Sequence, residues 1–301
     1  MRTARRRLGR VACMAALLPS LLLSGCFVIS TTRRLPVPKA PAIVQSVTPE
    51  DLVARLNQRW AALDTMTAKV EILTSVLKTK EGVAQDYTRI GGIILMRKPE
   101  MLRVLGRAPV IGLPIFDMAS DGQTFTLYIP SKDMAYKGPA TLDKVSKNQY
   151  ENLRPGFFLD ALVVRGVEPD EFYSVTSDSE TIEDAAKKHL YFVPEYILTI
   201  TKRVPGSHRD QVVRVVTFHR EDLLPYEQDL YDAAGNLETH VTYRDYQDFG
   251  SGLYPGTVTI RRPIEGSQIV MLVEKVTENV ALPADQFVVN VPPGTEIKTL
   301  Q

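Results

Sequence analysis

Apolar residues recur with a helical period in one segment near the start of the chain. Thr48 suits an N-cap and Pro49 suits the first helical position, and the two acidic residues that follow complement the positive end of a helix dipole. The next apolar side chains are spaced by four, four and three residues, at Leu52, Leu56, Trp60 and Leu63. The pattern predicts an amphipathic helix over 48–64 that packs one stripe on a large apolar surface.

From Met66 onward the period changes to two. Apolar and polar residues alternate in short runs joined by connections of two to six residues, and Asp121-Gly122 is a hairpin signal between two runs. Short connections of this kind join antiparallel neighbours. We expect a mainly β protein with a helical cover, an α+β architecture. Its core is one strongly curved antiparallel sheet, or an unclosed β-barrel whose open side is plugged by helices.

The β pattern is interrupted over 141–165. Thr141 suits a helix cap, Pro155-Gly156 breaks that helix, and a short, very apolar piece with Phe157 and Phe158 follows. Water would not tolerate such a piece exposed, so we expect it to pack on the sheet or to cover an opening in it.

The first tenth of the chain is typical of a targeting segment. Five arginines precede an apolar run over 11–23, whose 13 residues fit a secretory signal and are too few to span a bilayer. The run ends at Leu23-Ser24-Gly25-Cys26, which resembles the lipobox of bacterial lipoproteins. The resemblance implies cleavage before Cys26 and attachment of lipid to its sulfur. An ordinary signal with a chance cysteine is the alternative.

The chain thus divides into a signal peptide over 1–25, a lipidated cysteine with a Pro-rich tether over 26–47, and a single domain over 48–301. The residue after Cys26 is Phe27 and not Asp, which by resemblance to sorting in Gram-negative bacteria implies the outer membrane, facing the periplasm. Several acyl chains anchor a protein firmly, because each buried methylene contributes about 0.8 kcal/mol. The tether is extended by its prolines, or it packs along the domain with Val44 and Val47 docked.

Charge narrows the choice of partners. The 301 residues carry a formal net charge of +1, but the signal removes five arginines and no acid, which leaves 276 residues with a net charge of −4. A mildly acidic protein lacks the electrostatic footprint of a nucleic-acid binder. Cys13 leaves with the signal and Cys26 carries lipid, so no thiol remains for redox or metal chemistry. We expect a monomer with no cofactor other than the covalent lipid at Cys26.

The sequence has no catalytic or metal-binding pattern with the required spacing. The four histidines show no metal-ligand spacing and no neighbouring carboxylate cluster, and nucleophile-elbow, P-loop and GxGxxG patterns are missing. Two acidic groups, at 168–171 and 178–184, are typical of solvated loops. A hydrolase with paired carboxylates stays open, because sequence does not give their separation in space. The sequence therefore predicts a protein that is not an enzyme and binds no metal.

Apolar residues at strand spacing are candidates for the concave face of the sheet. They are Val70, Ile72, Ile94, Leu102, Val104, Phe125, Leu127, Leu198, Ile200, Val213, Val215, Leu230, Met271 and Val273. A curved sheet with a helical cover leaves a cavity for an acyl chain, which these side chains would line. The alternative is an ordinary core in which large side chains such as Phe116, Phe125 and Met271 plug the interior.

The loop over 107–115 is unusually apolar for a segment in water. It carries Val110, Ile111 and Leu113 between proline and glycine. We expect this loop, together with Phe157 and Phe158, to fold over the cavity mouth or to touch the bilayer. A buried crossover is the alternative for the loop.

Short motifs along the strands resemble a known superfamily. They are Gly-Leu-Pro-Ile-Phe over 112–116, Ser-Asp-Gly-Gln-Thr-Phe-Thr-Leu-Tyr-Ile-Pro over 120–130, Met-Ala-Tyr-Lys-Gly over 134–138 and Tyr-Pro-Gly-Thr-Val-Thr-Ile over 254–260. With the early helix and the helical insertion, they resemble the LolA/LolB superfamily of bacterial periplasmic lipoprotein carriers and receptors over 48–297. The resemblance implies an unclosed β-barrel with helices over its open side. It also implies an apolar cavity that takes acyl chains such as palmitate by transfer, without covalent chemistry.

The sequence leaves three hypotheses. The leading one is a LolB-like lipoprotein, anchored to the membrane by lipid, that binds lipid or lipoprotein acyl chains. Its role is lipoprotein or lipid transfer, or outer-membrane maintenance, with a periplasmic carrier as a partner. The second is a non-enzymatic envelope scaffold or interaction lipoprotein with a filled core. The third is a hydrolase that uses one of the acidic loops.

Overall fold

The computed structural model describes residues 41, 43–78, 83–86, 89–140, 155–184, 189–250 and 252–300, and residues 39–301 form one compact unit. The predicted signal, Cys26 and most of the tether lie outside the described residues. None of the described helices has the length and apolar character needed to cross a membrane.

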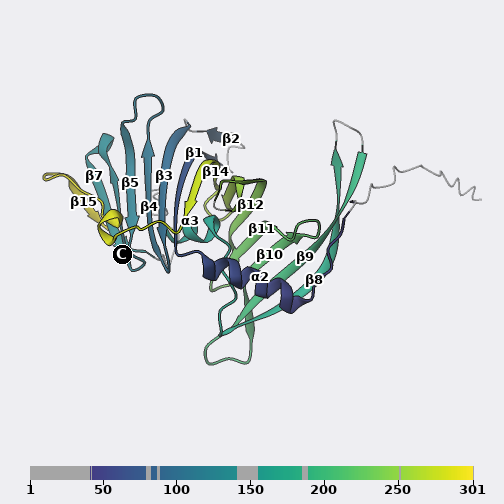
Figure 1. The fold of residues 1–301 in the computed structure, drawn as a ribbon. Coiled ribbons are helices and arrows are strands. Elements are labelled where there is room, and N and C mark those ends of the chain that lie inside the picture. Colours follow the sequence, from purple (N-terminus) through teal and green to yellow (C-terminus); the bar gives the residue numbers. More distant parts are fainter. Residues whose placement is uncertain are drawn as a thin grey trace, which may run out of the picture. The chain divides into compact units, whose positions relative to one another are not determined.

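The described part of the chain is mostly β-strand (Figure 1). The strands are β1 Thr65–Lys78, β2 Val83–Asp86, β3 Ile90–Arg97, β4 Met101–Arg107, β5 Pro114–Ser120, β6 Thr124–Ile129, β7 Met134–Pro139, β8 Glu171–Asp184, β9 His189–Arg203, β10 Asp210–His219, β11 Pro225–Tyr231, β12 Leu237–Asp248, β13 Leu253–Arg262, β14 Ser267–Glu278 and β15 Glu296–Thr299. The helices are α2 Pro49–Ala62 and α3 Pro155–Leu162, with short 3₁₀ turns η2 Pro130–Lys132 and η3 Ala284–Phe287.

All strands belong to one curved sheet that does not close. Its order is β15-β7-β6-β5-β4-β3-β1-β14-β13-β12-β11-β10-β9-β8, and β2 pairs with β1 off this path. Neighbours are antiparallel except β15, which runs parallel to β7. The two end strands, β15 and β8, are not paired with each other in the described part of the chain. The predicted fold class, an unclosed antiparallel sheet with a helical cover, is therefore confirmed.

The predicted helix over 48–64 forms as α2, and its start has the expected cap. Thr48 Oγ1 accepts a hydrogen bond from Asp51 N at 3.1 Å. The stripe of the helix buries Leu52, Val53 and Leu56. Trp60, which the spacing also placed on this stripe, is only half-buried, and its ring lies beneath the Lys98 ammonium at 4.6 Å.

The hairpin signal at Asp121-Gly122 is confirmed in its details. Asp121 Oδ1 accepts hydrogen bonds from Gln123 N at 2.9 Å and Thr124 N at 2.7 Å, which fixes the turn between β5 and β6. Gly122 has φ of +94°, a left-handed conformation that glycine adopts without strain. The conformation of this turn is therefore determined by residues within the turn itself.

The region over 171–203 differs from the prediction. The acidic group at 178–184, expected in a solvated loop, continues strand β8, which pairs with β9 along its length. β8 is the end strand of the sheet, and its backbone pairs with β9. Of the acidic group, Asp178 and Glu180 are exposed to water, and the side chains of Glu183 and Asp184 lie outside the described part of the structure.

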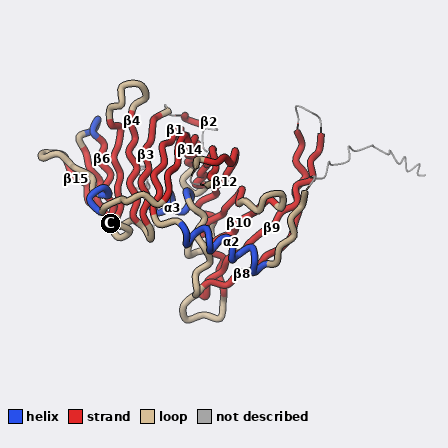
Figure 2. The backbone as a smooth tube through the Cα atoms, in the orientation of Figure 1, coloured by secondary structure: helices blue, strands red, loops and turns tan. Residues whose placement is uncertain are grey.

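The side chains beneath the sheet form two buried clusters. The first lies under β1 and β3–β7 together with β12–β14, and it includes residues of α3 such as Leu159 and Leu162. The second lies between α2 and strands β9 and β10, where Leu52 and Leu56 pack with Leu198 and Phe218 (Figure 2). Part of the predicted cover over 141–165 thus forms as α3, and its first piece lies outside the described residues.

The last residues of the predicted tether are fastened to the sheet. Gln45 N donates to Arg220 O at 2.7 Å, and Arg220 Nε donates back to Gln45 O at 3.1 Å. Val47 N donates to the Tyr196 hydroxyl at 3.2 Å, and the Val47 side chain packs against the second cluster. Val44, the other residue expected to dock, is 43% exposed. The end of the tether therefore packs along the domain, as one of its two alternatives predicted.

Candidate functional site

An apolar cavity of about 230 Å³ lies beneath α2, on the second cluster. Its walls come from α2, from the residues after α3, from the β10–β11 connection and from β12 and β13. The lining residues are Leu52, Arg55, Leu56, Arg59, Leu162, Val163, Val164, Phe218, Asp222, Leu223, Leu224, Pro225, Tyr243, Tyr246 and Pro255. Most of this wall is aliphatic or aromatic, so the cavity suits an apolar ligand.

Tyr243 and Tyr246 line the cavity, and Tyr254 lies beside it, next to the lining residue Pro255. The Tyr243 hydroxyl is buried without a hydrogen-bond partner among the described residues, whereas the other two hydroxyls bond to backbone carbonyls. The Tyr246 hydroxyl donates to Pro225 O at 2.6 Å, and the Tyr254 hydroxyl donates to Leu162 O at 2.6 Å. Burial raises the pKa of both hydroxyls far above the usual tyrosine value, so they stay neutral. The Tyr254 bond also fixes the end of α3 against β13.

Polar ties between α2 and its surroundings are few and lie at its edges. Asn57 Oδ1 accepts a hydrogen bond from Val167 N at 2.7 Å. Arg59 Nη2 donates to Leu253 O at 2.5 Å, and Lys98 Nζ donates to Trp60 O at 2.6 Å. The rest of the attachment is apolar packing on the second cluster, so α2 rests on the sheet as an amphipathic cover.

The candidate concave-face residues are mostly packed in the interior. Those in the first cluster are Val70, Ile72, Ile94, Leu102, Val104, Phe125, Leu127, Met271 and Val273, and each is at most 6% exposed. Leu198 and Ile200 lie in the second cluster. None of the fourteen candidates lines the apolar cavity. The large side chains Phe125 and Met271 are buried in the first cluster, and Phe116 is partly buried against that cluster.

Strand β10 corrects two of these predictions. Its buried face carries Arg214, Val216 and Phe218, so Val215 lies on the opposite face. A bulge at 212–214 changes the phase of the strand, and Val213 packs only partly against the second cluster. The phase was predicted wrongly because Arg214 is buried by an ion pair with Glu171, at 2.8 Å.

A second cavity, of about 510 Å³, is polar. Val213 and Leu230 line it together with four basic and four acidic side chains: Arg165, Lys202, Arg214, Arg262, Asp160, Glu168, Glu171 and Glu238. Asp160, Glu171 and Glu238 each form an ion pair with an arginine of the same cavity. Burial raises the pKa of Asp160, and the charge of Arg165 opposes that rise. In the other acidic group, over 178–184, the described side chains of Asp178 and Glu180 are exposed along β8.

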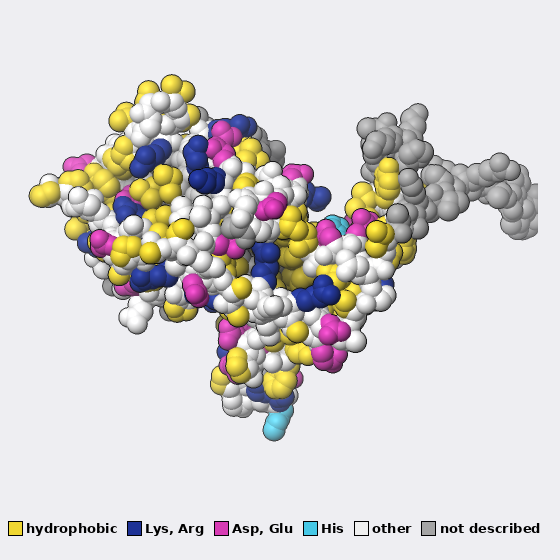
Figure 3. Space-filling view, in the orientation of Figure 1, with side chains coloured by type: hydrophobic (Ala, Val, Ile, Leu, Met, Phe, Trp, Pro, Cys, Tyr) yellow, Lys and Arg dark blue, Asp and Glu magenta, His cyan; other side chains and the backbone are white. Residues whose placement is uncertain are grey.

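The apolar loop between β4 and β5 points into solvent. Val110, Ile111 and Leu113 are 106%, 67% and 61% exposed. Figure 3 shows hydrophobic side chains gathered at the tip of this loop, which Figure 1 places above β4 and β5. The alternative of a buried crossover is therefore wrong. Of the other two lid candidates, Phe158 is buried in the first cluster, and the side chain of Phe157 lies outside the described part of the structure.

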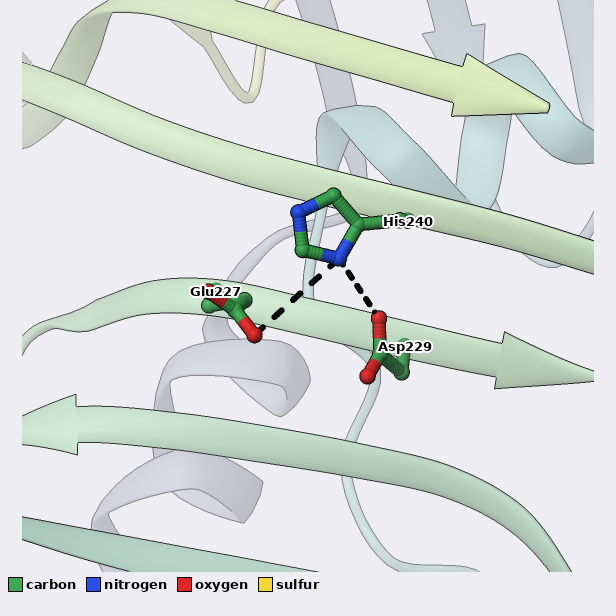
Figure 4. Close-up of side chains that lie close together, drawn as sticks. All are labelled: Glu227, Asp229 and His240. Atoms are coloured by element: carbon green, nitrogen blue, oxygen red, sulfur yellow. Dashed lines mark hydrogen bonds and ion pairs between the residues drawn. The ribbon is translucent and has the colours of Figure 1, made fainter. Parts of the chain in front are cut away.

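The face of the sheet opposite the second cluster carries a group that the sequence reading missed. His240 Nδ1 lies 2.7 Å from Asp229 Oδ1 and 4.0 Å from Glu227 Oε1, and Figure 4 shows the nitrogen directed at both carboxylates. Asp229 pairs with His240 across β11 and β12, and Glu227 lies two residues away on the same face. The prediction that the histidines have no neighbouring carboxylate cluster is wrong for His240. The alternation Glu-x-Asp before a tight turn, with a histidine on the return strand, was the signal available.

Electrostatics couples this group. The hydrogen bond with Asp229 raises the pKa of His240, and the charge of Glu227 adds to the effect. Burial raises the pKa of Glu227, while His240 opposes that rise. The titrations of Glu227 and His240 therefore depend on each other.

Comparison with known proteins gives structural relatives only. No protein-family model matches the chain, and no curated protein matches its sequence. The structure is similar to a LolA superfamily protein from Nitrosomonas europaea, with 14% identity, 81% of this chain and 99% of that chain covered, and a TM-score of 0.49. It is similar to a DUF1329 family protein from Desulfovibrio piger, with 15% identity, coverage of 79% and 95%, and a TM-score of 0.47.

A third similar structure is an outer membrane lipoprotein-sorting protein domain from Vibrio parahaemolyticus. The identity is 12%, the alignment covers 79% of this chain and 94% of that chain, and the TM-score is 0.46.

Proposed function

We propose that this protein is a bacterial envelope lipoprotein, anchored at Cys26 in the outer membrane, that binds acyl chains of lipids or lipoproteins beneath α2 and passes them on without catalysis. The observation that carries the proposal is the apolar cavity under an amphipathic helix that has few polar ties. The lipobox-like end of the signal and the lipoprotein-sorting name of a structural neighbour support the membrane and cargo parts of the proposal.

The size of the cavity requires α2 to move. Ligand pockets typically hold about 300–1,000 Å³, and this cavity holds about 230 Å³. When α2 shifts, the apolar side chains that now pack on Leu52 and Leu56 become the floor of a larger groove. An acyl chain replaces the helix stripe there, and each methylene it buries contributes about 0.8 kcal/mol. Handover is favourable when the acceptor buries the same chain better.

Charged residues at the cavity suit the polar end of a lipid. Arg55 and Arg59 line it on the α2 side, and Asp222 lines it on the opposite side. Arginine binds carboxylate and phosphate oxygens with two parallel hydrogen bonds, so an acyl chain in the cavity would place an anionic group beside these side chains. Arg59 is already held by Leu253 O, which leaves Arg55 as the main contact.

The exposed β4–β5 loop is the proposed contact with the bilayer. Its tip presents Val110, Ile111 and Leu113 to solvent, and the exposed Arg107 stands at its base. An apolar tip inserts into the acyl boundary of a membrane while a basic residue faces the anionic headgroups. The loop therefore gives the domain a second membrane contact besides its anchor.

The experiment uses a soluble form of the chain that begins at Ser30. Native mass spectrometry after incubation with palmitate is expected to show a one-to-one complex. Leu224 lines the cavity and is half-buried, so Leu224→Trp fills the cavity and removes the complex. Leu237→Trp, at a half-buried site away from the cavity, is the matched control. Binding that Leu224→Trp leaves unchanged would place the ligand elsewhere.

An envelope scaffold is the second candidate, and a specific observation favours it. Nine of the predicted cavity residues belong to a filled core, including Phe125 and Met271. If the protein carries no lipid after purification and takes up none from vesicles, the filled core is its functional state and the scaffold role replaces the carrier role.

A further inference from the structure

The Glu227, Asp229 and His240 group has more negative charge than an ion pair needs. His240 and Asp229 already satisfy each other at 2.7 Å. Apart from His240, no described residue forms a hydrogen bond or ion pair with the Glu227 carboxylate. Glu180 and Glu195 add negative charge around Glu227, and Arg261 is the opposing cation beside His240. The site therefore favours a cation beyond the proton on the imidazole.

The ligand atoms are close enough to share one ion. The imidazole nitrogen and the two carboxylate oxygens all lie within 4.8 Å of one another. A tetrahedral Zn²⁺ with bonds of about 2.0–2.2 Å holds its ligand atoms about 3.3 Å apart. To bind the ion, the distance from His240 Nδ1 to Asp229 Oδ1 must increase from 2.7 Å, and the distance from His240 Nδ1 to Glu227 Oε1 must decrease from 4.0 Å. Both carboxylates keep some solvent exposure, at 21% and 36%, so rotamer changes accomplish this without moving the strands.

We propose that Glu227, Asp229 and His240 form a binding site for a divalent transition-metal ion of the Zn²⁺ class. One imidazole with two carboxylates is a donor set that Zn²⁺ accepts, whereas Ca²⁺ and Mg²⁺ prefer oxygen donors alone. The backbone of two paired strands fixes all three residues, because Asp229 faces His240 in the register and Glu227 follows the same face.

The arrangement points to a clip between strands and not to a hydrolytic centre. The ion joins β11 to β12, and water completes its coordination on the solvent side. Neither the apolar cavity nor the polar cavity described above is lined by these residues. Binding to the folded state alone then stabilises the protein by mass action.

The test is calorimetric titration of the full, purified chain with Zn²⁺ after removal of bound metals. We expect one ion per chain, and at least ten-fold weaker binding in His240→Gln and in Glu227→Gln. His208→Gln changes an exposed histidine in the β9–β10 turn and serves as the matched control. It is expected to bind Zn²⁺ like the wild type.

Folding is checked separately, by the melting temperature of each variant without metal. Glu227→Gln keeps the shape of the side chain, so its metal-free melting temperature should equal that of the wild type. Added Zn²⁺ should raise the melting temperature of the wild type and not that of Glu227→Gln. The absence of stoichiometric Zn²⁺ binding, or equal Zn²⁺ affinity in the wild type, His240→Gln and Glu227→Gln, would overturn the proposal.

Discussion

Asn57 Oδ1 accepts a hydrogen bond from Val167 N at 2.7 Å, which ties α2 to the segment that follows α3. Both elements line the apolar cavity, so this bond holds two of its walls together. Because Asn57 joins α2 to the segment after α3, its hydrogen bond opposes the separation of these two walls. In the proposed carrier role, ligand entry under α2 therefore depends on a bond that a single substitution removes.

Asn57→Ala is expected to lower the free energy of unfolding by about 1 kcal/mol, because it removes one hydrogen bond and leaves the Val167 amide without this acceptor. It should also speed the uptake of palmitate. Trp60 on α2 is the only tryptophan of the chain, so its fluorescence reports the movement of the helix. Gln58→Ala, at an exposed position of the same helix, is the control. Equal uptake rates in both variants would argue against movement of α2.

Val110→Asn is expected to stabilise the protein. Val110 has φ of +69°, a left-handed conformation that a β-branched residue adopts only with strain and that asparagine tolerates. Its side chain is fully exposed, so the change loses no packing. The gain should be about 1 kcal/mol in urea unfolding. A loss of stability would mean that Val110 makes contacts in solution that the structure lacks.

Replacing Ile111 and Leu113 together by Asp should abolish binding of the soluble form to vesicles that contain anionic lipid, measured by co-sedimentation. The cause is the loss of the apolar tip and the repulsion of acidic side chains by the headgroups. Surface changes of this kind leave the free energy of unfolding within about 0.5 kcal/mol. Ile264→Asp, at a half-exposed turn between β13 and β14, is the comparison and should bind normally. Normal binding by the loop variant would rule out the loop as a membrane contact.

Asp121 makes stability depend on pH. Hydrogen bonds from Thr124 N and Gln123 N lower the pKa of its carboxyl below the ordinary 3.8. A lowered pKa in the folded state stabilises the protein above pH 3.8, and that contribution is lost as the pH falls through the folded value. Asp121→Asn should therefore be less stable than the wild type at pH 7, and the difference should shrink in acid. A difference that is constant from pH 7 to pH 3 would contradict the assignment.

Features set by neighbouring residues were predictable from the sequence. The helix begins at its cap because Thr48 bonds to Asp51, three residues away. The turn at Asp121 forms for the same local reason. The alternation of apolar residues also predicted an antiparallel sheet with one buried face, because this alternation lies within each strand and does not depend on distant residues.

Features set by register and docking were not predictable. The phase of β10 depends on a bulge and on the buried ion pair of Arg214 with a residue 43 positions away. His240 meets Asp229 only through the pairing of two strands. The apolar cavity exists only because of where α2 docks. The sequence does not give that place, because the apolar stripe of α2 fits any apolar surface of similar width. Eleven of the fourteen candidates therefore marked the interior, and none of them marked the apolar cavity.

The fastening of residues 45–47 has a mechanical consequence. In a protein held to a membrane at Cys26, tension travels along the tether and meets the paired bonds of Gln45 with Arg220 before it reaches the first turn of α2. Those bonds, together with the hydrogen bond from Val47 N to the Tyr196 hydroxyl, transmit the force to the sheet. Under the proposed anchoring, the first turn of α2 would thereby be shielded from a pull along the tether.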